Sequence, residues 1–78
     1  MTIKVTADHI KRGRRAQCFE CPVALALDEA TGQFWKVKSA SLYNVTSNLQ
    51  IHNVPLSVTT FVRDFDDGRI VSPFEFEL

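Results

Sequence analysis

The segment from Cys18 to Leu27 constrains the fold of this chain more than any other. Its sequence, Cys-Phe-Glu-Cys-Pro-Val-Ala-Leu-Ala-Leu, leads from two cysteines straight into a proline and an apolar run. Proline is favoured at the first position of a helix, where its missing N–H would have no partner. The segment therefore predicts a helix from Pro22 to about Thr31, with Gly32 as its stop. Apolar residues nearly surround this helix, which implies burial on several sides.

Two shorter patterns predict further helices. Thr6 is a suitable cap for a helix over residues 7–12, and Gly13 is expected to end it in a left-handed conformation. A later helix is expected to begin at Pro55 and to end at Gly68. Its apolar face has the spacing i, i+3, i+4 and i+7 and consists of Val58, Phe61, Val62 and Phe65.

Alternating apolar and polar residues predict strands over residues 3–5, 35–38, 42–45, 49–51 and 74–78. With the helices, this order predicts a two-layer α+β domain with three short helices and a small antiparallel or mixed sheet of about four to five strands. A chain of 78 residues leaves no room for a second domain, so residues 1–78 are expected to form one domain.

The charges of the chain balance overall but not along its length. Residues 1–38 hold seven Lys or Arg and four Asp or Glu, and residues 39–78 hold two and five, so the halves carry net charges of +3 and −3. Overall balance argues against the general basic excess of a non-specific nucleic-acid binder. The one basic cluster could neutralise phosphates or could pair with carboxylates of the same molecule. It consists of Lys11, Arg12, Arg14 and Arg15.

The acidic counterpart lies at the end of the last helix and on the last strand, and it consists of Asp64, Asp66, Asp67, Glu75 and Glu77. Paired carboxylates can act as acid and base only within a cleft that shifts their pKa values, and these positions are expected to face solvent. A solvated face and an acidic surface that docks on a basic protein both fit the pattern. We expect no catalytic residues among them.

The Cys18/Cys21 pair allows four interpretations. It supplies half of a zinc site, but His9 and His52 stand at unrelated distances and no convincing second half is present. A redox pair, a structural disulfide and two small buried residues are the alternatives. Packing is favoured, so we expect no metal and no cofactor. Neither histidine has a Ser or Cys partner at a recognisable spacing for nucleophilic catalysis.

The expected environment is a reducing cytosol. The chain shows no secretory leader, no apolar run of about 18 residues that could span a membrane, and only two cysteines. Association with a membrane is therefore not expected.

Over nearly its whole length the chain resembles a family of short proteins encoded by phages and prophages. The most specific blocks are Cys18-x-x-Cys21-Pro22-Val23-Ala24-Leu25-Ala26-Leu27 and Pro73-Phe74-x-Phe76-x-Leu78, supported by Val5-Thr6, His9-Ile10, Gly13, Pro55, Phe61, Phe65-Asp66 and Gly68. Residues 33–53 are not distinctive.

The resemblance implies an anti-CRISPR protein, acting on a type I system in the host cytoplasm. Such inhibitors bind a Cas protein, block access to DNA or to a nuclease, and usually need no cofactor. The resemblance carries over no contact residues, so the acidic set is predicted on charge alone. A small nucleic-acid-binding phage protein that uses the basic cluster is the alternative. A zinc- or redox-active module at the two cysteines is the second alternative.

Overall fold

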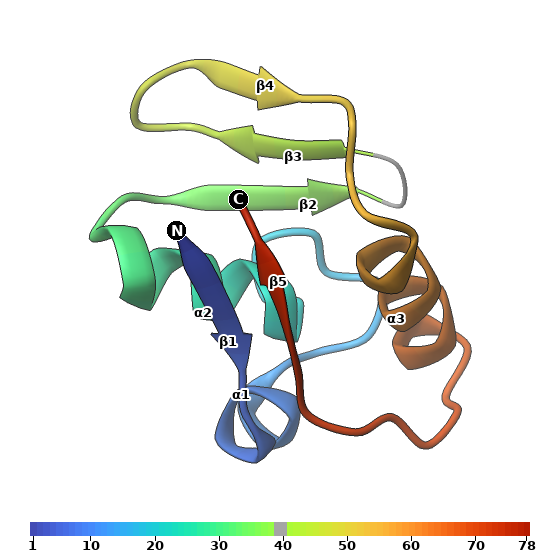
Figure 1. The fold of residues 1–78 in the computed structure, drawn as a ribbon. Coiled ribbons are helices and arrows are strands. Elements are labelled where there is room, and N and C mark those ends of the chain that lie inside the picture. Colours follow the sequence, from blue (N-terminus) through green and yellow to red (C-terminus); the bar gives the residue numbers. More distant parts are fainter. Residues whose placement is uncertain (39–40) are drawn as a thin grey trace.

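The computed structural model describes residues 1–38 and 41–78, and within them the α+β class is confirmed (Figure 1). In chain order the elements are β1 (Thr2–Val5), α1 (Ala7–Arg12), α2 (Pro22–Thr31), β2 (Trp35–Lys38), β3 (Ser41–Asn44), β4 (Leu49–Ile51), α3 (Leu56–Asp66) and β5 (Phe74–Glu77). In this described part of the chain, no helix has both the length and the apolar character needed to cross a membrane.

The strands among these residues form two antiparallel sheets where a single sheet was expected. β1 pairs with β5, and β2, β3 and β4 pair in sequence order. The loop before α2 explains the division, because the carbonyl of Cys18 accepts a 2.9 Å hydrogen bond from the N–H of Val37 in β2. That loop occupies the edge of β2 on which a further strand would have paired.

Helix α2 packs against β1, β2 and α1, and so joins the two sheets (Figure 1). Its start at Pro22 and its stop at Gly32 are confirmed, and Gly32 has the left-handed φ of 70°. Val23, Ala24 and Leu27 are fully buried. The predicted burial of this helix on several sides is therefore confirmed.

Helix α1 begins as predicted at Thr6, whose hydroxyl accepts from the backbone N–H of His9. The predicted left-handed conformation of Gly13 is wrong, since its φ of −67° and ψ of 156° are extended. Space explains the glycine here, because a Cβ on Gly13 would lie 2.6 Å from Cγ of Pro22. Gly13 thus lets the end of α1 pass directly over the start of α2.

The predicted apolar face of α3 is confirmed, since Val58, Phe61, Val62 and Phe65 are all buried. Pro55 is the residue before the first helical turn, and Gly68 follows the helix with a φ of 79°. The ring of Phe61 lies 4.7 Å from the ring of Phe74 between centroids, which fastens α3 to β5.

We expect the two glycines beside α2 to respond differently to alanine. Gly32→Ala has open space and loses only the left-handed backbone preference, about 1 kcal/mol. Gly13→Ala must displace Pro22 and is expected to lose roughly 2–3 kcal/mol of unfolding free energy by overpacking. Urea denaturation of both variants measures the difference, and a Gly13→Ala protein as stable as the parent would contradict the close approach.

Phe61→Ala should lower the free energy of unfolding by about 3–5 kcal/mol, because it empties a buried position against Phe65 and Phe74. The matched control on the same helix is Leu56→Ala, whose side chain is 79% exposed and should cost less than about 0.5 kcal/mol. Equal melting temperatures of the two variants would refute this assignment of the helix face.

Candidate functional site

The acidic residues of α3 have different partners. Oδ1 of Asp64 lies 3.5 Å from Nη1 of Arg69, and Asp64 is half-buried. Asp66 accepts a 3.0 Å hydrogen bond from the backbone N–H of Ala16. Asp67 is exposed and forms the end of the helix. Only Asp67 of these three carboxylates lacks a hydrogen bond or ion pair with the described residues.

Glu75 and Glu77 lie on the outer face of the β1–β5 sheet, opposite the buried Phe76. Glu75 is in register with Lys4, and Glu77 is in register with Thr2. The hydroxyl of Thr2 donates to Glu77, whose other oxygen lies 3.7 Å from the N-terminal amine. Glu77 is therefore partly neutralised within the molecule.

The structure does not gather the five carboxylates into a single hollow. Asp66 lines a cavity beside the cysteines, whereas Glu75 lines a groove of about 350 Å³ with Lys4 and Phe74. A docking surface built from all five stays a prediction. Asp67 and Glu75 form no ion pair with any described residue, which makes them the carboxylates most available to a partner.

Two of the four residues of the basic cluster are paired with carboxylates. Arg12 contacts both Asp8 and Glu29, and Nε of Arg14 lies 3.9 Å from a carboxylate oxygen of Glu20. The guanidinium of Arg15 lies beside Gly68 at the end of α3, 3.2 Å from the position of an added Cβ. This helix end carries the negative end of the dipole, which favours a cation. Lys11 is exposed and has no ion pair within the described residues.

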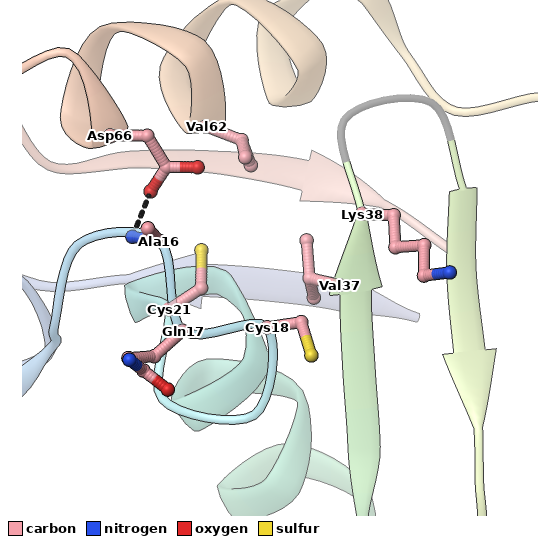
Figure 2. Close-up of a pocket in the computed structure, with 8 residues that line it drawn as sticks. All are labelled: Ala16, Gln17, Cys18, Cys21, Val37, Lys38, Val62 and Asp66. Atoms are coloured by element: carbon pink, nitrogen blue, oxygen red, sulfur yellow. Dashed lines mark hydrogen bonds between the residues drawn. The ribbon is translucent and has the colours of Figure 1, made fainter.

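The two cysteines line a cavity of about 360 Å³ together with Val37, Lys38 and Asp66 (Figure 2). Both are free thiols, and Figure 2 shows their sulfurs pointing in different directions. Burial raises the pKa of Cys21 to about 11, and the N–H groups at the start of α2 only partly oppose it. A neutral, buried Cys21 fits packing and not thiolate chemistry.

No group of three or more His, Cys, Asp or Glu side chains that could hold a metal ion occurs among residues 1–38 and 41–78. His52 is exposed. His9 is 5% exposed, and its Nδ1 accepts from the N–H of Thr6 while its Nε2 lies 3.0 Å from Glu29. His9 therefore holds α1 against α2 and is not available as a ligand.

Two acidic residues near the end of α2 have different partners. Glu29 contacts Arg12 and His9. Asp28 is half-buried and accepts a 2.8 Å hydrogen bond from the backbone N–H of Trp35. The carboxylate thereby fixes the turn from α2 into β2.

One surface feature, an exposed aromatic pair, was not predicted from the sequence. The rings of Phe19 and Phe34 stack with centroids 5.0 Å apart, and Nζ of Lys36 lies 5.9 Å from the centroid of Phe19. The alternation of lysines along β2 signalled a polar sheet face, but nothing in the sequence joined Phe19 to it.

No family model matches this chain, and no curated protein or solved structure matches it.

The thiols should differ in reactivity. At pH 8 a buried Cys21 of pKa about 11 is ionised in only about one molecule in a thousand, so Cys18 should react first with a thiol reagent. A Cys21→Ser protein should keep the fast phase and a Cys18→Ser protein should lose it. One equivalent of zinc in protein purified without added metal would contradict the assignment of both residues as free thiols.

Glu29 should contribute to stability in a pH-dependent way. Its 3.0 Å contact with Nε2 of His9, and then its hydrogen bond with Arg12, lower its pKa from the ordinary value. The contribution is therefore fully present above the unfolded pKa of about 4.3 and is lost as the pH falls through the folded pKa. Glu29→Gln should melt below the parent at pH 7, and the gap should close in acid. Glu20→Gln is the control, and the same closing gap there would refute the assignment.

Proposed function

We propose that this protein is a phage-encoded, non-enzymatic inhibitor of host immunity that binds a Cas protein in the host cytoplasm and blocks its access to DNA. The partner is proposed from the resemblance of the Cys18–Leu27 and Pro73–Leu78 blocks to phage proteins. The exposed connection between α3 and β5 supports a binding role. A target that handles nucleic acid has a basic groove, and an acidic surface on a domain of balanced charge can be steered to it.

The observation that carries this proposal is the loop over residues 68–73. Ile70 in this loop is 100% exposed. Asp67 precedes the loop and Glu75 follows it, and neither forms an ion pair with the described residues. Figure 1 shows the loop running from the end of α3 to the start of β5. An apolar contact with charges around it is the usual composition of a protein interface.

The remaining acidic residues contribute less to this surface. Asp64, Asp66 and Glu77 already have partners, so binding through them must first replace those contacts. We therefore assign the docking surface to Asp67, Ile70 and Glu75. The raised pKa of Cys21 works against a nucleophilic thiol, which also favours binding over catalysis.

The test is capture of Cas proteins from a type I system, followed by association rates at several salt concentrations. Asp67→Lys/Glu75→Lys should slow association and weaken its decrease with salt, because steering acts on the association rate. Ile70→Asp should weaken binding about tenfold or more by speeding dissociation.

The matched controls carry the same changes elsewhere. Asp8→Lys/Glu20→Lys makes the same change of net charge at two exposed carboxylates, which pair with Arg12 and Arg14. Leu56→Asp places the same carboxylate at another apolar position, whose side chain is 79% exposed. Both should bind like the parent. Failure to capture any Cas protein would reject the partner, and equal losses in test and control variants would reject the surface.

A further inference from the structure

The outer face of the β2–β4 sheet carries a second surface of different chemistry. In the register of the sheet, Lys36, Tyr43 and Gln50 form one row across the strands, and Lys38 pairs with Ser41 in the next row. Adjacent positions along each strand point into the core, as the buried Val37 and Leu42 show. These row residues line a hollow of about 220 Å³.

The aromatic pair extends this face beyond the edge of β2. The hydrogen bond from Val37 to the carbonyl of Cys18 holds the loop against β2 and brings Phe19 beside Lys36. Phe34 stacks on Phe19 with an interplanar angle of 1°, and the two residues are 47% and 41% exposed. We call this surface the basic–aromatic face, and it consists of Phe19, Phe34, Lys36, Lys38, Tyr43 and Gln50.

The charged side chains of the face are two lysines, and both lie on β2. No Asp or Glu occurs between Glu29 and Asp64 in the sequence, so β2, β3 and β4 contribute no carboxylate to this sheet. Neither Lys36 nor Lys38 forms an ion pair with a described residue, in contrast to Arg12 and Arg14. The two amines are thus available to an anionic partner.

We propose that the basic–aromatic face binds single-stranded nucleic acid. Lys36 and Lys38 contact successive phosphates, and a base stacks on the exposed ring of Phe34. Tyr43 and Gln50 line the hollow. The hydroxyl of Tyr43 donates to Oδ1 of Asn48 and can accept a hydrogen bond from a base or sugar, and the amide of Gln50 can donate or accept one. An unpaired strand is required, because bases within a duplex have no free face to stack on the ring. An acidic peptide would use the lysines but would leave the aromatic pair without a partner.

This proposal is independent of the docking surface at Asp67, Ile70 and Glu75. It concerns other residues and another class of partner, so either can fail alone.

Fluorescence anisotropy with labelled oligo-dT and oligo-U of about 12 nucleotides tests the proposal at salt concentrations from about 50 to 200 mM. The parent should bind one or both strands, and the two probes distinguish DNA from RNA. Lys36→Gln/Lys38→Gln should reduce the slope of log K against log salt by about 1.4, since each phosphate contact contributes about 0.7. Phe34→Ala should weaken binding about fivefold or more at every salt concentration.

The controls separate a specific face from general attraction of anions. Lys4→Gln/Lys11→Gln removes two exposed lysines elsewhere, and Leu49→Ala truncates a side chain in the row of Trp35 on the opposite face. Both should bind like the parent, and circular dichroism should show the parent spectrum for every variant compared. Absence of parental binding at the lowest salt would overturn the proposal. The proposal would also be overturned if a duplex bound as tightly as the single strands, or if poly-glutamate competed as well as an unlabelled oligonucleotide. Losses of binding in the control variants as large as those in the test variants would overturn it too.

Discussion

The burial of α2 between the two sheets is the interaction on which the rest of the described structure depends. The β1–β5 and β2–β4 sheets are not paired with each other, and a two-stranded sheet is at best marginally stable alone. β1 buries Ile3 and Val5 and β2 buries Trp35 and Val37, and both strands pack on α2. Removal of apolar surface from water at this helix therefore stabilises both sheets together.

Local sequence signals predicted the helices well, because those signals act over a few residues. Pro22 at the first position of α2, the left-handed Gly32 and the four-residue face of α3 each follow from backbone geometry or periodicity. The division into two sheets could not be predicted in this way. It depends on which distant strand reaches each edge, and a loop carbonyl at Cys18 decides this for β2. Gly13 was misjudged for the same reason, since Pro22, not its own backbone, requires a glycine there.

The charged residues that could form a binding surface could be found from the sequence. The intramolecular partners that decide whether these residues are free to bind another molecule could not. The basic cluster could be located, yet the pairing of Arg12 with Glu29 depends on how α1 lies against α2. Only the lysines of the basic–aromatic face could be predicted from the sequence. Its lysines alternate along β2, whereas Phe19 and Phe34 lie in loops and meet through tertiary contacts.

The pairing of β1 with β5 joins segments from opposite parts of the chain, with Ile3 opposite Phe76. During synthesis, β1 therefore has no strand partner until residues 74–77 have left the ribosome. Throughout that interval, the apolar side of β1 can be covered by α2, but its backbone edge toward β5 is open to any passing strand. A release of the chain before Phe74 would leave this edge open permanently, so a chain without β5 is expected to pair with strands of other molecules and to aggregate.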